Sequence, residues 1–291
     1  MKKIISLRDD DINWFTDPKR LEALYEPIFY LVKPTLCVTP FVGEIYWKVR
    51  ESELLLQSKK EKLEFVRGLW LQKDIDKIRY SIYDNEQLMG LLRKWCIEGK
   101  VEIALHGITH NQSPEGFECE AEPPSFEEFN VILSNLEDAL GTKIKWFSPP
   151  NNSIKKSWMK ILKLCGLNLI HSIGPKPWET QLNIRTLFSL SRVAIDVISR
   201  GRKSRLNQAL SLGEIALLQS IPFSPGMQAE EIFVNLHDAA NSGGSIVVAT
   251  HSYAFDYAPE LYLELVELLK CARSLGFLPG TFSEQLKCVV S

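Results

Sequence analysis

The chain has almost no excess charge of either sign. Its 34 lysine and arginine residues are balanced by 36 aspartate and glutamate residues, which gives a formal net charge of -2. Proteins that bind nucleic acid or an anionic membrane surface usually carry a basic excess or a polybasic cluster. We therefore expect neither nucleic acid nor a charged lipid surface as a partner.

Long apolar runs are missing as well. No stretch approaches the roughly 20 apolar residues that cross a bilayer. The apolar run at 4–7, which follows the N-terminal lysines, is far shorter than the roughly 7–15 residues of a secretory signal. We expect no transmembrane segment and a cytoplasmic location.

The chain also lacks paired cysteines, linker segments and sequence repeats. The 6 cysteines are scattered without a CxxC pair, which is typical of reduced and mostly buried thiols. Cys119, in a polar loop, is expected to be the most exposed thiol. No segment is rich in proline, glycine or serine, and no repeat is visible, so we predict one domain over 1–291, long enough to bury a large core.

Short apolar strand candidates alternate with amphipathic helix candidates from end to end. Near-continuous apolar strands are typical of parallel sheets covered by helices. About seven β-then-α units predict an α/β fold with a distorted, closed or nearly closed (β/α)7 barrel, an open doubly wound sheet being the alternative. The strand candidates are 3–7, 35–41, 101–105, 143–147, 168–171, 214–221 and 245–250, with further candidates at 187–190 and 193–198.

Helix signals lie between these strands. Asp17 followed by Pro18 predicts a capped helix start, and Ser125 begins a capping box that leads to a stop at Gly141. Ser153 is the expected cap of a helix over 158–165. The segment 259–275 predicts the last long amphipathic helix.

Two polar clusters each follow a strand candidate. Arg-Asp-Asp-Asp at 8–11 follows the first, and His-Gly-Ile-Thr-His at 106–110 follows the third. Pro-Pro-Asn at 149–151 and His251 follow two others. The carboxyl ends of parallel barrel strands share one face, and carboxylates with imidazoles are ligands for a divalent metal. The combination predicts a metal-dependent hydrolase.

Each cluster also has a plainer interpretation. Residues 9–11 could form a solvated turn that caps a helix, and the histidines could be hydrogen-bonded loop side chains. His171 could face the pocket. The basic run 200–205 is either a solvated loop or a phosphate-binding element, and Trp14 and Trp178 are candidates to stack on a sugar.

Four motifs occur in the order seen in one known family. Leu-Arg-Asp-Asp-Asp at 7–11, His-Gly-Ile-Thr-His at 106–110, Phe-Ser-Pro-Pro at 147–150 and Val-Ala-Thr-His at 248–251 resemble the NodB-homology polysaccharide deacetylases. The chain is similar to a divergent, cytoplasmic branch of that superfamily, the WbmS-type deacetylases of O-antigen biosynthesis. The resemblance implies a distorted (β/α)7 barrel with one divalent metal, most often zinc, with cobalt, nickel, iron or manganese also compatible with Asp and His ligands.

By position, the resemblance makes Asp11, His106 and His110 the metal ligands. It makes Asp10 the general base and His251 the general acid. A shift of one residue, with Asp9 as base and Asp10 as ligand, is the alternative.

Two positions depart from the family pattern. Ile12 replaces a glycine, and Ser148 replaces the arginine that orients the base. Arg8 is the candidate substitute for that missing cation.

The resulting expectation is removal of an acetyl or formyl group from an N-acylated sugar in surface polysaccharide biosynthesis. The substrate would be a nucleotide sugar, a lipid-linked precursor or a glycan under assembly. Two alternatives stay open: an inactive barrel that binds carbohydrate or protein, and a metal-dependent hydrolase acting on a non-sugar amide or a phosphoester.

Overall fold

The computed structural model describes residues 2–52, 59–70, 79–113, 116–171, 210–212, 215–224 and 229–290. Four features that the sequence analysis names lie outside these residues: the further strand candidates 187–190 and 193–198, Trp178 and the basic run 200–205. In the described part, no helix has the length and apolar character needed to cross a membrane.

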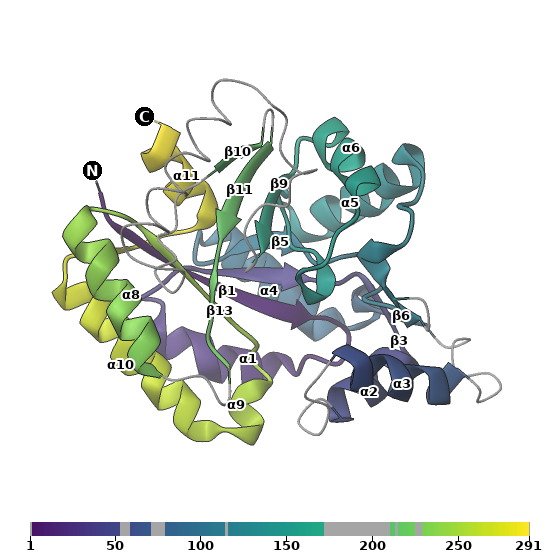
Figure 1. Ribbon diagram of the computed structural model, residues 1–291, viewed down its shortest axis with the longest axis horizontal. Coiled ribbons are helices and arrows are strands. Elements are labelled where there is room, and N and C mark those ends of the chain that lie inside the picture. The colour runs from purple at the N-terminus through teal and green to yellow at the C-terminus, as the bar shows by residue number, and fades with distance from the viewer. Residues whose placement is uncertain are drawn as a thin grey trace.

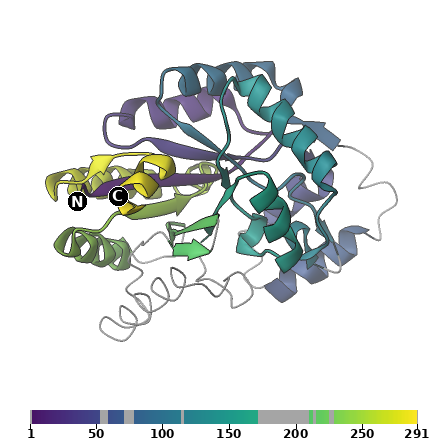
Figure 2. The same ribbon diagram turned by 90° about the horizontal axis from the view of Figure 1, so that it is seen from above.

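A largely parallel sheet curls into a barrel with helices around it (Figures 1 and 2). The barrel strands are β1 (Ile4–Ile12), β2 (Pro34–Val38), β5 (Glu102–Leu105), β8 (Trp146–Phe147), β9 (Asn168–His171), β11 (Ile215–Gln219), β12 (Ile221–Pro222) and β13 (Ile246–Thr250). The order around the barrel is β11, β9, β8, β5, β2, β1, β13 and β12. The predicted α/β barrel is confirmed.

One short segment joins the two edges of this sheet. β11 pairs in parallel with β9, and β12, which follows after Ser220, pairs in parallel with β13. The segment therefore changes its partner half-way along and closes the barrel. β10 (Leu210–Leu212) adds an antiparallel strand beside β11, and β14 (Leu278–Pro279) pairs with the start of β1.

Helices and short elements complete the described chain. The helices are α1 (Pro18–Tyr25), α2 (Glu44–Ser52), α3 (Lys59–Trp70), α4 (Glu86–Ile97), α5 (Phe126–Leu140), α6 (Lys156–Leu164), α8 (Ala229–Ser242), α9 (Ala254–Tyr257), α10 (Pro259–Ser274) and α11 (Phe282–Val290). The 3-10 turns are η1 (Glu26–Ile28), η2 (Ile82–Asp84), η3 (Glu118–Glu120) and η4 (Pro150–Asn152). Two small antiparallel pairs join β3 (Phe41–Gly43) to β4 (Arg79–Ser81) and β6 (Gln112–Ser113) to β7 (Gly116–Phe117).

The helix boundaries test the cap predictions. Asp17 accepts hydrogen bonds from backbone N–H groups at the start of α1, and the capping box of Ser125 is present at α5, which ends at Gly141 in the left-handed conformation. The prediction for Ser153 is wrong: α6 begins after Lys155 without a side-chain cap, and the Ser153 hydroxyl donates to Glu120 instead.

Two other expectations are wrong: the end of the first strand and the exposure of Cys119. The first strand continues past residue 7 to Ile12, because its charged side chains have buried partners: Arg8 pairs with Asp10, and Asp9 accepts from Tyr25 on the helix side. Cys119 is fully buried, since η3 packs its side chain into the hydrophobic core.

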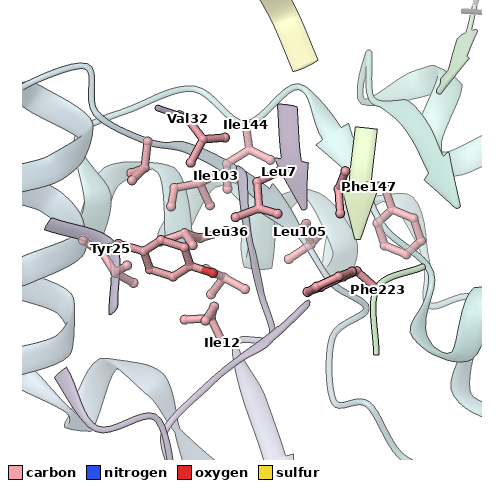
Figure 3. Packing of buried hydrophobic residues seen from close by; sticks show 14 of the residues in the cluster. Leu7, Ile12, Tyr25, Val32, Leu36, Ile103, Leu105, Ile144, Phe147 and Phe223 are labelled. Carbon is pink, nitrogen blue, oxygen red and sulfur yellow. The ribbon is translucent and has the colours of Figure 1, made fainter. Parts of the chain in front are cut away.

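The core has two parts because strand side chains alternate between the two faces of the sheet. The larger part lies between the barrel and the helices and includes Leu7, Leu36, Leu105 and Phe147 (Figure 3). The smaller part fills the barrel interior: Cys37, Ala104, Trp146, Ile170, Leu218 and Val247, with Phe282 of α11. α11 therefore plugs the end where β1 begins, and burial of Phe282 contributes about 1.5–3 kcal/mol. The candidate functional site lies at the opposite end of the barrel, toward which β1 points (Figure 1).

Candidate metal centre and active site

The direction of each aspartate follows from its place on β1. Ile5 and Leu7 face the helices, so Arg8 and Asp10 face the barrel interior. Asp11 would face the helices again if the alternation continued. Instead its φ is +70°, and the pairing of β1 with β2 shifts register between Asp9 and Ile12. This bulge turns Asp11 toward the same pocket as Asp10.

Asp11 lies beside two histidines from the segment after β5. Its Oδ1 is 3.2 Å from Nε2 of His106 and 3.1 Å from Nε2 of His110. All three side chains are buried, and one ligand atom from each lies within 4.8 Å of the others. The structure therefore brings together the three residues that were predicted to hold a metal.

The hydrogen bonding of His106 identifies what these atoms could hold. Its Nδ1 lies 2.9 Å from the carbonyl oxygen of Ser148, which can only accept, so Nδ1 carries the proton. When the ring is neutral, the lone pair of Nε2 points at Asp11 Oδ1, which is also an acceptor. In the described part of the chain that oxygen is buried without a hydrogen bond. Two facing acceptors repel each other, and a divalent cation between them would remove the repulsion.

Asp11 also has the charge that a ligand needs. Burial would raise the pKa of Asp11, but the positive charge of a protonated His110, with hydrogen bonds from His106 and His110, outweighs burial and holds that pKa well below its usual range. A divalent cation between the same atoms would supply that positive charge when both rings are neutral. Metal ligands must be deprotonated, so the donor set of one carboxylate and two imidazoles fits a zinc-like ion.

Arg8 lies at the centre of a second network. Its Nε and Nη2 donate to the two carboxylate oxygens of Asp10 at 2.8 and 2.5 Å, and Nη2 also donates to Ser148 Oγ at 2.7 Å. Nη1 donates to Asn152 and Ser220. Arg8 thus places a cation against Asp10, as expected of a substitute for the missing arginine, and it also reaches the hydroxyl of Ser148.

The same pairing sets the ionisation of Asp10. Burial would raise its pKa, but the Arg8 guanidinium outweighs burial and lowers the pKa of Asp10 to about 2. Asp10 is therefore a carboxylate throughout the neutral range, which a proton acceptor requires.

Asp9 points to the other side of β1. Its Oδ2 accepts from the Tyr25 hydroxyl at 2.8 Å, and its Oδ1 accepts from the Ser252 N–H at 2.7 Å. Ser252 directly follows His251, so Asp9 holds the segment that carries this histidine. The alternative register, with Asp9 as base and Asp10 as ligand, does not match this arrangement.

His251 approaches the centre from the end of β13. Its Nε2 is 3.7 Å from Asp11 Oδ2, and its side chain is 35 % exposed, whereas Asp11 is 8 % exposed. It therefore stands at the mouth of a pocket of about 270 Å³. The lining residues are Asp10, Asp11, Tyr46, Val49, His106, His110, Gln112, Asn151, Asn152 and His251.

Some lining residues were missed by the sequence analysis. Tyr46 of α2 packs its ring edge against His110, with ring centroids 5.0 Å apart. Asn152 was missed too, whereas Asn151 belongs to the cluster 149–151 that was expected at this face. Both are in the left-handed conformation, with φ of 55° for Asn151 and 51° for Asn152. His171 is buried but does not line this pocket, and Trp14 stacks on Tyr80 at 4.7 Å. Ile12, at the glycine position, belongs to the core (Figure 3).

The Asp9→Asn variant is expected to lose a pH dependence of stability. Burial raises the pKa of Asp9 to about 7, despite hydrogen bonds from Tyr25 and Ser252. The folded state keeps this proton up to about pH 7, whereas the unfolded chain releases it near pH 4. Wild-type stability should therefore fall as pH rises through this window.

Denaturant unfolding of metal-free protein between pH 4 and pH 8 tests this. The wild type should lose more stability than Asp9→Asn across the range, because an amide at this position does not titrate. Parallel curves for the two proteins would show that Asp9 is ionised throughout.

Comparisons with known proteins place the fold. No protein-family description matches the chain, and no curated protein matches its sequence. Among solved structures, it is similar to the Xyl-CE4 domain of a multidomain xylanase from the hindgut metagenome of Trinervitermes trinervoides. The TM-score is 0.50 at 13% identity, over 99% of this chain and 91% of that chain.

Two further structures are similar at lower scores. The family 4 carbohydrate esterase from Streptomyces lividans, in complex with acetate, has a TM-score of 0.44 at 10% identity, over 98% of this chain and 94% of that chain. A GH57 branching enzyme from Thermococcus kodakaraensis has a TM-score of 0.49 at 14% identity, over 99% and 71%. At these identities the similarity concerns the fold, and function has to be argued from the site.

Proposed function

We propose that the chain is a metal-dependent hydrolase that removes an acetyl or formyl group from an N-acylated sugar. The observation that carries the proposal is the convergence of Asp11, His106 and His110 on one point, with the Arg8–Asp10 pair beside it. Three protein ligands leave positions for water and substrate, as in catalytic rather than structural metal sites.

The metal would be held by Asp11, His106 and His110. When bound, a divalent ion there would polarise the acyl carbonyl and lower the pKa of water toward ~7. Zinc suits this donor set best, and cobalt, nickel, iron and manganese are compatible with it.

Two other side chains would move protons. Asp10 is ionised and lines the pocket, so it would accept the proton of the attacking water. His251 lines the same pocket at its mouth and would protonate the amine nitrogen, which leaves poorly as an anion. The two roles would thus be carried by side chains at the ends of two paired strands, β1 and β13.

The Arg8–Asp10 pair argues against the inactive-barrel alternative. That alternative was motivated by Ser148 at the arginine position, but Arg8 reaches the same carboxylate from two residues away on β1. The base is therefore held by a cation in this chain too.

The substrate class is proposed from the four sequence motifs that resemble the NodB-homology polysaccharide deacetylases. The barrel, which is similar to that of the Xyl-CE4 domain of a xylanase, is the fold that this resemblance implies. We propose an N-acylated sugar as substrate, presented as a nucleotide sugar, a lipid-linked precursor or a glycan. A cytoplasmic location and a role in O-antigen or related surface polysaccharide biosynthesis are part of the same proposal.

Release of acetate and formate from a panel of N-acyl sugars, with zinc-loaded protein, tests this function. Asp10→Asn and His251→Ala should each lower turnover by about 10²–10⁴-fold, the usual contribution of a general acid or base. His237→Ala, an exposed histidine on α8, is the matched control and should keep full activity.

Other products would assign another reaction. Ammonia or phosphate would point to a cyclic amide or a phosphoester. Full activity in Asp10→Asn and His251→Ala would contradict the mechanism, and no product from metal-loaded wild type would favour a binding barrel.

A further inference from the structure

One carboxylate holds the whole loop between the two histidines. Oε1 of Glu118 accepts from the backbone N–H groups of Ile108 and Thr109, at 3.0 and 2.9 Å, and from the Thr109 hydroxyl at 3.1 Å. Its Oε2 accepts from the N–H of His110 at 2.9 Å. Four donors from three consecutive residues thus end on a single side chain from η3.

The loop needs such an acceptor because its backbone is irregular. Gly107 and His110 are both left-handed, with φ of 63° and 50°, so the intervening N–H groups have no helix or strand partners. Buried N–H groups without acceptors are costly. A Cβ at Gly107 would lie 2.3 Å from Glu118 Oε2, so glycine at this position lets the carboxylate approach the backbone.

The two histidines differ in how their rings are oriented. His106 donates its outer nitrogen, Nδ1, to the Ser148 carbonyl, the arrangement by which metal-binding histidines are usually held. Nδ1 of His110 is buried without a hydrogen bond in the described part of the chain. Besides Asp11 and the His106 ring, His110 contacts the Tyr46 ring edge to face and donates its own N–H to Glu118.

Glu118 is itself held in place. Its N–H donates to the Asn111 carbonyl at 2.9 Å, and the next carbonyl, of Cys119, accepts from the Lys155 N–H at 2.8 Å. Cys119 is fully buried. The short turn therefore joins the loop to the start of α6, and Glu118 has little freedom to follow a displaced histidine.

We propose that Glu118 is a positioning residue for the metal ligand His110, acting through the His110 backbone N–H as the Ser148 carbonyl acts on the His106 ring. This inference rests on the proposed metal site. It assigns a function to the turn η3, which fixes where the third ligand stands.

Glu118→Gln tests the proposal, with Co²⁺ as the probe. The amide keeps the size of the side chain but turns one acceptor oxygen into a donor that faces backbone N–H groups. Co²⁺ affinity, titrated by visible absorption, should fall about 10–100-fold, as for the loss of other groups that orient metal ligands. The visible spectrum of bound Co²⁺ should also change, because the position of His110 changes.

Glu120→Gln is the matched control. Glu120 lies on the same turn and accepts from the Phe117 N–H and the Ser153 hydroxyl, neither of which belongs to the histidine loop 106–110. It should lose stability without a change in Co²⁺ affinity or spectrum. Glu118→Asp, which keeps the charge but shortens the side chain, should also weaken Co²⁺ binding and serves if the glutamine variant does not fold.

The outcomes separate the two proposals. If wild type binds Co²⁺ and both Glu118 variants match its affinity and spectrum, the role of Glu118 is overturned and the metal site stands. If wild type binds no Co²⁺ and His106→Ala behaves identically, both proposals fall.

Discussion

His106→Ala is expected to lose the bound metal of the wild type. Purified without an affinity tag, the wild type should hold about one equivalent of a divalent metal per chain, as a site with three protein ligands does. Removing one of three ligands, and the Nε2 lone pair that faces Asp11, leaves a carboxylate and one imidazole. Elemental mass spectrometry should then give a stoichiometry near zero, with deacetylation lost as well.

The control and the contrary result are both simple to obtain. His237→Ala removes an exposed histidine of α8 and should keep the wild-type stoichiometry. Absence of metal from wild type after incubation with zinc, cobalt, nickel and manganese salts would contradict the site. Equal metal content in wild type and His106→Ala would place the metal elsewhere.

Arg8→Met is expected to have the largest effect on stability. Arg8 is 1 % exposed and pairs with Asp10, which is 7 % exposed. Methionine of similar length leaves the Asp10 carboxylate buried without its cation, and breaking a buried pair in this way costs about 3–5 kcal/mol. The loss should be greatest above pH 4, because the low pKa of Asp10 makes the pair stabilising there and the contribution disappears as pH falls toward about 2.

A double variant isolates the charge. Arg8→Met with Asp10→Asn removes both charges, and its free energy of unfolding should recover much of the loss seen in Arg8→Met alone. Urea unfolding of the metal-free proteins at pH 7 measures all four members of the cycle. If Arg8→Met lies within about 1 kcal/mol of wild type, Asp10 is not held as a buried ion and the assignment of its state is wrong.

The barrel and the residues at its carboxyl end were predictable because both depend on local signals. Apolar strands alternating with amphipathic helices specify the layers, and polar residues after a strand must gather at one face of a parallel barrel. That argument brings Asp11, His106 and His251 together without any knowledge of distances.

The direction of each aspartate was not predictable from the same pattern. Strict alternation places Asp9 and Asp11 on one face and Asp10 on the other, whereas the bulge at Asp11 puts Asp10 and Asp11 in one pocket and leaves Asp9 outside. A bulge depends on the register of both neighbouring strands, so no short segment of sequence reports it.

Glu118 shows a second limit. It is one of several glutamates in a polar loop, and its partners are backbone N–H groups, which have no signature in the sequence. Phe282 is similar, because a plug at the end of a barrel follows from the packing of α11 rather than from any periodicity.

The segment that changes partners between β11 and β12 has a consequence for how the chain folds. Until it docks, β9 and β13 each present an unpaired edge, and such edges invite pairing with other chains. Closure brings together strands that are distant in sequence, which slows folding by raising contact order. A partly folded molecule would thus be an open sheet with two unpaired edge strands. Because pairing between molecules at these edges competes with closure of the barrel, the recovery of active protein after denaturation should fall as the protein concentration rises.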